Sequence, residues 1–257
     1  MTVLQAGILF LFGAILGSFL NVCIYRLPRK ESVIWPGSNC PYCKSRIPLL
    51  LNVPLLSYVI LRGKCRYCKH RIPLTYPLVE LITGALLVLL WRYHGFSLSF
   101  LHYSILLLFL LPITFIDLNH KLILNVLTFP GMAIGIALSL GLGLKTIPQV
   151  LTGLVLGGGF LWLVGRLGKS IFKQESMGGG DIKLGAMIGV FIGPEVLIAL
   201  FLAFFLALPV IAIGLSSGRM RLGSTLPFGP FIALATVVIV CFGPVLYQVY
   251  FSLLGYV

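Results

Sequence analysis

The sequence has little charge, and it has very few acids. Only 10% of its 257 residues are charged, and six Asp and Glu stand against nineteen Lys and Arg. An ordinary soluble domain has about a quarter of its residues charged, so this chain has too little polar surface for a soluble globule. Hydrophobic residues make up 59% of it, which excludes disorder as well. The composition predicts an all-α, polytopic integral membrane protein.

Eight apolar segments are predicted to form the membrane helices, since a span needs about 20 mainly apolar residues. They are residues 3–25, 76–93, 98–117, 122–141, 147–167, 182–193, 194–214 and 226–254. The sixth is short for a span. A turn is expected after it at Gly193-Pro194, because proline ends a helix and glycine frees the backbone.

The formal charge of +13 is interpreted as a topology signal and not as a nucleic-acid signature. Lys and Arg in short loops stay on the cytoplasmic side of a membrane. With the N-terminus outside, seventeen of the nineteen fall inside, and only Arg92 and Lys145 fall outside. The first apolar run is too long for a signal-peptide core and lacks a basic start, so we expect it to remain in the mature protein.

Four of the six cysteines lie in the one sizeable polar loop, residues 26–75, as two CxxC pairs separated by 21 residues. The two pairs belong to an internal repeat, because the stretch from Cys40 to Leu49 recurs 25 residues later from Cys65 to Leu74. A loop of this size is too small to form a conventional hydrophobic core, so a cross-link such as a bound metal must stabilise it. The spacing lies just past the usual window for a four-cysteine zinc site. We therefore predict a structural zinc ion held by Cys40, Cys43, Cys65 and Cys68.

Two disulfides or redox-active CxxC motifs are the alternatives to a metal. A reducing cytoplasmic location makes disulfides the less favoured interpretation. A zinc ion held by four thiolates has no open coordination position for a substrate. The site is therefore expected to stabilise the loop and not to catalyse a reaction. The remaining cysteines, Cys23 and Cys241, are interpreted as small core residues.

Two of the six acids stand out by their position. Asp117 ends an apolar run, and Asp181 follows Gly178-Gly179-Gly180 just before the sixth apolar segment, so both lie at the cytoplasmic boundary. Ionisable groups at such positions are costly and indicate function. The other three boundary or loop acids, Glu31, Glu175 and Glu195, are interpreted as solvated or dipole-stabilised groups.

Two carboxylates that share one site titrate as a unit, because both cannot easily ionise together. One can take a proton from water while the other donates a proton to a carbonyl, as in aspartic proteases. A helix N-cap for Asp181 and a boundary anchor for Asp117 are the structural alternatives. Paired membrane acids also mark ion and proton pathways, so the residues alone leave a catalytic pair and a relay both open.

The motifs resemble those of the type IV prepilin peptidases, which are GxGD membrane aspartic proteases. The similar stretches are 17–28, 76–84, Ile116-Asp117, 175–186 and the paired CxxC loop. The resemblance implies cleavage of the leader from prepilins and pseudopilins at the cytoplasmic face of the bacterial inner membrane. It also implies N-methylation of the new N-terminus with S-adenosylmethionine.

By motif matching, the resemblance places the two catalytic aspartates on Asp117 and Asp181 and the four zinc ligands on the loop cysteines. It implies a first helix at 1–25, a zinc-binding domain at 26–75 and a membrane-embedded peptidase domain at 76–257. One departure is visible, because many members carry Leu-Pro-Asp where this chain has Ile123-Leu124-Asn125. The missing acid weakens any role for a third carboxylate.

The methyl-transfer site is less well located, since no soluble Gly-rich nucleotide fold is evident. Glu80 either orients the substrate amine or, as we favour, pairs with an arginine at the boundary. Asn21 is expected to form an interhelical hydrogen bond, and His102 shows no ligand pattern. Small-xxx-small spacing predicts close helix packing at Gly13/Gly17, Gly131/Gly135 and Gly153/Gly157.

Four other functions compete with the peptidase. They are a proton-coupled transporter, a methyltransferase without protease activity, a GxGD protease of other membrane substrates, and a membrane scaffold built on the zinc loop. A transporter predicts acids at mid-membrane depth and a repeat among the helices, neither of which the sequence shows. The oligomeric state is left open.

Overall fold

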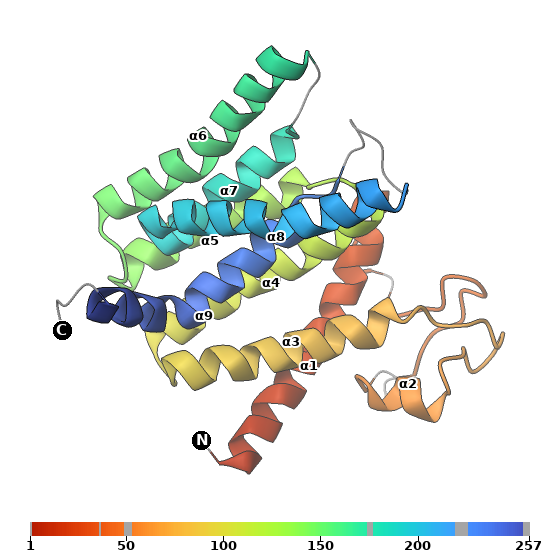
Figure 1. The fold of residues 1–257 in the computed structure, drawn as a ribbon. Coiled ribbons are helices and arrows are strands. Elements are labelled where there is room, and N and C mark those ends of the chain that lie inside the picture. Colours follow the sequence, from red (N-terminus) through yellow and green to blue (C-terminus); the bar gives the residue numbers. More distant parts are fainter. Residues whose placement is uncertain (1, 36, 49–52, 174–176, 219–225, 254–257) are drawn as a thin grey trace. The chain divides into compact units, whose positions relative to one another are not determined.

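The computed structural model describes residues 2–35, 37–48, 53–173, 177–218 and 226–253, without the side chains of 172 and 244–253. In this part of the chain no strand forms, which confirms the all-α prediction. The helices in order are α1 (Val3–Arg26), η1 (Leu27–Arg29), α2 (Leu56–Ile60), α3 (Thr75–His94), α4 (Leu98–His120), α5 (Asn125–Gly141), α6 (Ile147–Phe172), α7 (Gly179–Ile192), η3 (Gly193–Glu195), α8 (Val196–Ser216) and α9 (Gly229–Leu253) (Figure 1).

Every predicted apolar segment coincides with one of these helices to within a few residues. Among the described residues, five helical runs are long and apolar enough to cross a membrane: Val3–Arg29, Thr75–His94, Leu98–His120, Ile147–Ile171 and Gly179–Ser216. The last run joins α7, η3 and α8. Helix α5 and the stretch Gly229–Gly243 are apolar but shorter.

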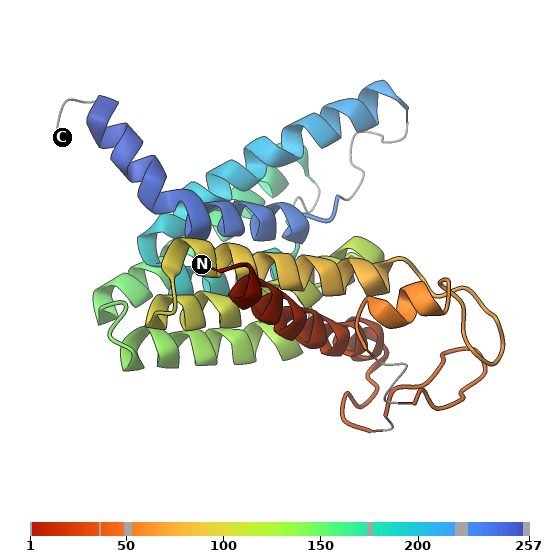
Figure 2. The same cartoon turned by 90° about the horizontal axis from the view of Figure 1, so that it is seen from below.

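The chain divides into two compact units, Met1–Arg92 and Tyr93–Val257. In the first unit α1 and α3 cross at very close range (Figure 2). A Cβ on Gly13 would lie 2.7 Å from the Cα of Gly84, so only glycine permits this approach. Asn21 donates a hydrogen bond of 2.9 Å to the carbonyl of Tyr76, which confirms the predicted interhelical bond.

In the second unit α7 lies at the centre and packs against α4, α5, α6, α8 and α9. Its residues 184–192 are all buried except the half-buried Ala186. At 14 residues, α7 is only about 21 Å long. This is short of the roughly 30 Å hydrocarbon core of a bilayer. A short helix cannot be held in place by its own span, so its position must come from its neighbours.

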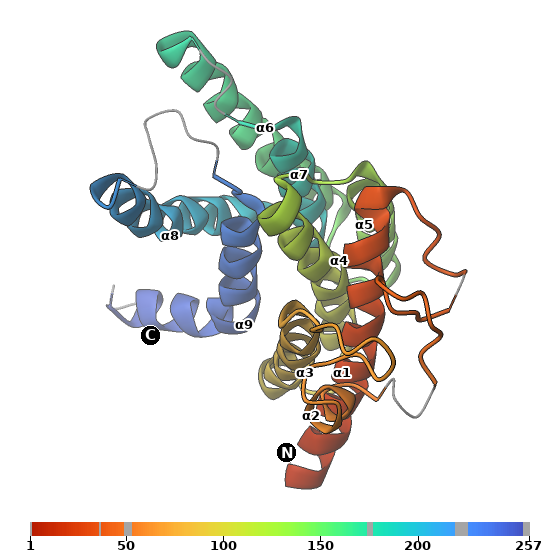
Figure 3. The ribbon, with the colours of Figure 1, turned by 90° about the vertical axis from the view of Figure 1, so that its right-hand side faces the viewer.

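Glycines supply that close packing, as the small-residue spacing predicted. Figure 3 shows α6 and α7 side by side, and their backbones meet at Gly153 against Gly189 and at Gly157 against Gly185. A Cβ on any of these four would overlap the backbone of the facing helix. On another face of α7, two glycines of α5 receive the side chains of Met187 and Phe191.

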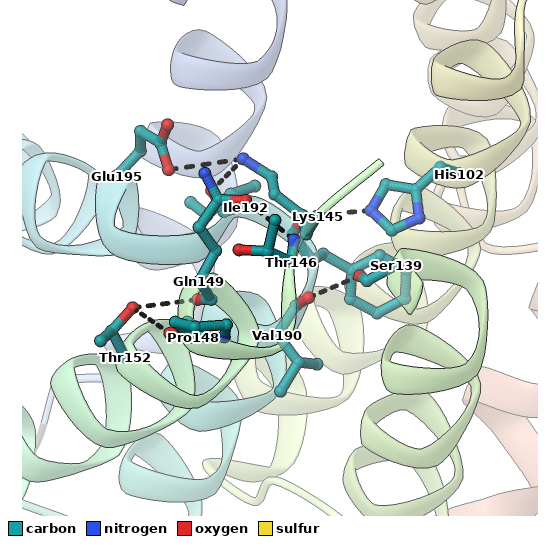
Figure 4. A network of polar contacts seen from close by, with 11 residues as sticks. His102, Ser139, Lys145, Thr146, Pro148, Gln149, Thr152, Val190, Ile192 and Glu195 are labelled. Carbon is teal, nitrogen blue, oxygen red and sulfur yellow. Dashed lines mark hydrogen bonds and ion pairs between the residues drawn. The ribbon is translucent and has the colours of Figure 1, made fainter. Parts of the chain in front are cut away.

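The C-terminal end of α7 is held by hydrogen bonds (Figure 4). The last carbonyls of a helix have no partner within the helix and need donors from elsewhere. Ser139 Oγ donates to the carbonyl of Val190 at 2.7 Å. His102 Nε2 donates to Phe191 at 3.0 Å, and Lys145 Nζ donates to Ile192 at 2.8 Å. Three successive carbonyls are thus satisfied by side chains from α4, α5 and the connection to α6.

The helix ends at the predicted turn. Gly193 has φ +75°, a conformation that side-chain-bearing residues rarely adopt, and it begins η3. Glu195 at the end of η3 forms an ion pair with Lys145 at 3.5 Å. Lys145 therefore binds both the last carbonyl of α7 and the turn that follows it.

We expect Gly157→Ala to destabilise the protein by about 1–3 kcal/mol, because the added methyl meets rigid backbone and forces α6 and α7 apart. The measurement is the unfolding midpoint of the purified protein in detergent. Gly159→Ala is the matched control on the same helix, because a Cβ at Gly159 would have no neighbouring atom within 4 Å. The control should be neutral or slightly stabilising. Equal midpoints for the two variants would contradict the close packing.

Candidate functional site

The two CxxC segments fold into equivalent turns, as their sequence repeat suggests. In the first, Cys40 donates its backbone N–H to the carbonyl of Ser45, and in the second Cys65 donates to that of His70. Lys44 and Lys69 occupy the same left-handed conformation, with φ of 58° and 59°. An isolated β-bridge closes each turn. The repeat therefore produces two matching halves of one site.

The four predicted cysteines form a cluster that could hold a metal ion. Their sulfur atoms all lie within 4.8 Å of one another, and all four thiols are free. The Sγ–Sγ distances are 3.8 Å for Cys40–Cys68 and 4.0 Å for Cys43–Cys65. Tetrahedral ligands at a Zn–S length of about 2.3 Å would be about 3.8 Å apart. The donor set and its spacing therefore fit a tetrahedral thiolate site.

The sulfurs also influence one another's protonation. The hydroxyl and then the backbone N–H of Ser45 lower the pKa of the Cys43 thiol to about 6. The backbone N–H of His70 acts to lower the pKa of Cys68, but desolvation and the neighbouring sulfurs outweigh it and raise that pKa to about 11. Four thiolates at this spacing repel one another unless a cation lies among them.

Asp117 lies in the last turn of α4 and is only 5% exposed. Its Oδ2 accepts a hydrogen bond of 2.9 Å from the backbone N–H of Gly229, the first residue of α9. A Cβ on Gly229 would lie 2.8 Å from that oxygen, so a glycine is required there. The positive end of the α9 dipole consequently points at the carboxylate. Sequence reasoning did not identify Gly229.

Asp181 lies in the first turn of α7, which begins after Gly178. Its backbone N–H donates to the carbonyl of Gly178 at 3.1 Å, and a Cβ on Gly178 would lie 3.1 Å from the Asp181 carboxylate. A Cβ on Gly180 would lie 2.7 Å from Ile123, whereas Gly179 faces open space. Two of the three glycines, Gly178 and Gly180, therefore permit close approaches that a side chain would prevent.

Helices α4 and α7 pack together, and the carboxylate of Asp181 lies within electrostatic range of that of Asp117. Each acid faces the N-terminal end of a helix, α7 for Asp181 and α9 for Asp117, and a helix N-terminus favours negative charge. Such an arrangement can hold one carboxylate charged beside a second that carries a proton.

Asn125, where the resemblance implied a missing third acid, is the first residue of α5. Its Oδ1 accepts a hydrogen bond of 2.8 Å from Lys183 Nζ, and the same ammonium lies 5.5 Å from the ring centre of Phe129. Lys183 is two residues beyond Asp181. The amide of Asn125 therefore links α5 to the N-terminal half of α7 at Lys183.

Glu80 is buried on α3, at 8% exposure. Its Oε2 accepts a hydrogen bond of 2.8 Å from the backbone N–H of Leu55, and Ser18 supplies a further hydrogen bond. The favoured pairing with an arginine is therefore replaced by bonds to the cysteine loop and to α1.

The fold and the site together define a helical membrane protein with one buried and one half-buried carboxylate at helix ends, and with a four-cysteine cluster. Family models match the chain at residues 11–94, as the bacterial peptidase A24 N-terminal domain, and at 104–213, as the type IV leader peptidase family. The cysteines fall in the first stretch and both aspartates in the second.

Relatives described as prepilin leader peptidase/N-methyltransferase match over most of the chain. The Myxococcus xanthus protein is 38% identical to this chain. The match covers 77% of this chain and 59% of the length of that relative. The Pseudomonas putida protein is 34% identical over 95% of this chain and 93% of its own. The Neisseria gonorrhoeae protein is 33% identical over 85% of this chain and 84% of its own length. No solved structure gave a significant match.

The chain belongs to the type IV leader peptidase family. This membership and the five apolar helices indicate a protein of the inner membrane.

We expect Cys40→Ser to lower bound zinc from about one ion per chain to near zero, because three thiolates no longer close the site. The loss should also lower the unfolding midpoint, since metal binding stabilises the folded loop. Metal analysis of the purified protein tests this. Cys23→Ser, outside the cluster, is the control and should keep its zinc. A Cys40→Ser protein with full zinc would refute the four-thiolate site.

Proposed function

We propose that this chain cleaves the leader peptide of prepilins and pseudopilins with Asp117 and Asp181, and then N-methylates the new N-terminus with S-adenosylmethionine. The observation that carries the proposal is the position of a buried carboxylate, Asp117, and a half-buried one, Asp181, at the meeting ends of α4, α7 and α9, inside the stretch that matches the leader peptidase family. Leader cleavage and methylation are supported by the names of the relatives.

In the proposed mechanism, the two carboxylates hold a water molecule against the scissile carbonyl. The charged carboxylate takes a proton from the water, whose oxygen forms a bond to the carbonyl carbon. The protonated carboxyl donates its proton to the carbonyl oxygen. When the tetrahedral intermediate collapses, the C–N bond breaks and the leaving nitrogen receives a proton from the acid that took it from water. The other carboxylate takes a proton from a hydroxyl of the intermediate, which forms the carboxylic acid product and restores the pair to its starting state.

The glycines before Asp181 suit a substrate that enters as extended chain. A Cβ at Gly179 would have no neighbouring atom within 4 Å, so the backbone is open to a neighbour on this side. We infer that the apolar helix of the prepilin packs between the membrane helices while its leader reaches the cytoplasmic boundary. The resemblance implies a basic leader, and we infer that the negative charge of the aspartate pair helps to hold it.

We propose an outside N-terminus, with the cysteine loop and the active site facing the cytoplasm. Lys145 lies at the C-terminal end of α7, opposite to Asp181, and is one of the two basic residues assigned to the outside. Lys121 and Lys183 accompany the aspartates at the other end. This distribution supports the orientation that the positive-inside rule gives.

We also propose that the cysteine cluster holds Zn²⁺ as a structural staple and that S-adenosylmethionine supplies the methyl group. In that transfer the lone pair of the neutral N-terminal amine forms a bond to the methyl carbon. The C–S bond breaks, its electron pair stays on sulfur, and the methylated amine releases a proton to solvent. A proton relay is less well supported, because both aspartates lie in terminal turns and not at mid-helix.

Asp117→Asn and Asp181→Asn should each slow leader cleavage by at least about 100-fold, since each removes one half of the acid–base pair. Purified protein is incubated with a prepilin, with and without S-adenosylmethionine, and the products are weighed by mass spectrometry. Glu31→Gln, at an exposed loop position, should cleave at the wild-type rate. Wild-type cleavage by either aspartate variant would rule out the pair. Cleavage without any methylated product would rule out the second activity.

Asn125→Asp should leave the cleavage rate within about threefold of wild type. The new carboxylate keeps the acceptor for Lys183, and an exposed ion pair adds only about 0–1 kcal/mol. The same mass-spectrometric assay gives the rate. A large gain in rate would instead assign a catalytic role to a third acid at this position.

A further inference from the structure

The first unit contains a pocket that the peptidase mechanism does not use. It lies among α1, the start of α3, α2 and the two cysteine turns, and it measures about 190 Å³. A cavity needs only about 10–15 Å³ by a comparable measure to admit one water molecule, so this one has room for a ligand. Figure 1 shows α2 and the loop beside these helices.

The pocket lining is rich in tyrosine. Five tyrosines contribute to it: Tyr25, Tyr42, Tyr58, Tyr67 and Tyr76. The ring of Tyr42 stacks on His70, with centroids 3.4 Å apart. Aromatic faces attract cations and stack on flat heterocycles. The lining therefore suits a ligand that has both a ring system and a positive charge.

The charged residues that line the pocket restrict the charge that a ligand can carry. Glu80 is the single acid among its lining residues, and it is buried. Its Oε2 accepts a hydrogen bond from the Leu55 N–H, and Ser18 supplies a second hydrogen bond to the carboxylate. Arg66 and Arg71 are exposed residues that also line the pocket. A ligand with a cationic centre near Glu80 and a carboxylate near the arginines would be complementary to this arrangement.

We propose that this pocket binds S-adenosylmethionine, with Glu80 facing the sulfonium and the tyrosines contacting the adenine. The proposal rests on the proposed methyltransferase function and gives it a location. S-adenosylmethionine combines a sulfonium cation, an aromatic base and an amino-acid carboxylate, which are the three features that the lining matches. A cationic ligand also accounts for an acid that is buried here and held by hydrogen bonds from Leu55 and Ser18.

The position of the site is tested by photolabelling. Full-length zinc-loaded protein in detergent is irradiated with S-adenosylmethionine that carries a tritiated methyl group, then digested and mapped. Label should appear on peptides within 38–80. Label confined to residues 93–257 would overturn the proposal while leaving methyltransferase activity intact.

The role of Glu80 is tested by equilibrium dialysis of two ligands. Glu80→Gln should weaken S-adenosylmethionine binding by about tenfold, the size expected for a lost charge-assisted contact. It should weaken binding of the neutral thioether S-adenosylhomocysteine much less. Glutamine keeps an oxygen for the Leu55 N–H, and zinc content confirms folding. Equal weakening of both ligands would indicate a structural role only and refute the assignment to the sulfonium.

Two further variants complete the test. Glu31→Gln makes the same charge change at an exposed site and should leave both affinities unchanged. Tyr42→Ala removes an exposed ring and should weaken both ligands by about threefold. Wild-type affinity in Tyr42→Ala and Glu80→Gln together would overturn the site. Tight binding at the site with no methylated prepilin would instead refute the proposed activity.

Discussion

The buried position of α7 is the constraint on which the second unit depends. This helix carries Asp181 in its first turn, yet it is too short to be fixed by crossing the bilayer alone. Its depth is set by backbone contact with α6 at paired glycines and by side-chain donors on its last three carbonyls. Because helices in lipid gain little from apolar burial, close contact and hydrogen bonds are the forces available to place it.

Rigid placement of α7 explains how two acids distant in sequence come together. Asp117 is fixed by the N–H of Gly229 at the start of α9, and α9 also packs on α7. The same helices that hold α7 therefore hold its partner carboxylate. The cysteine site of the first unit also depends on packing between segments. Its two short turns form one site only because their sulfur atoms lie close together. In both units, the geometry of the site therefore depends on how closely separate elements pack against each other.

Much of this was predictable from local pattern. The scarcity of acids singled out Asp117 and Asp181, the repeat singled out the four cysteines, and apolar runs located the helices. The contacts that position the acids were not predictable. Gly229 acts through its backbone N–H, which no sequence pattern identifies. His102 showed no ligand pattern because its hydrogen-bond partner is a backbone carbonyl. The hydrogen bond from Lys183 to Asn125 and the burial of Glu80 against Leu55 likewise depend on which segments meet in three dimensions.

The proposed mechanism requires that Asp117 and Asp181 act as one unit, and a double-mutant cycle on cleavage tests this requirement. Single-turnover rates are compared for Asp117→Asn, Asp181→Asn and the protein with both substitutions. Residues that act as a unit are strongly non-additive. The double variant should be no slower than the slower single variant. If the two losses multiply, the carboxylates act independently and do not form a catalytic pair.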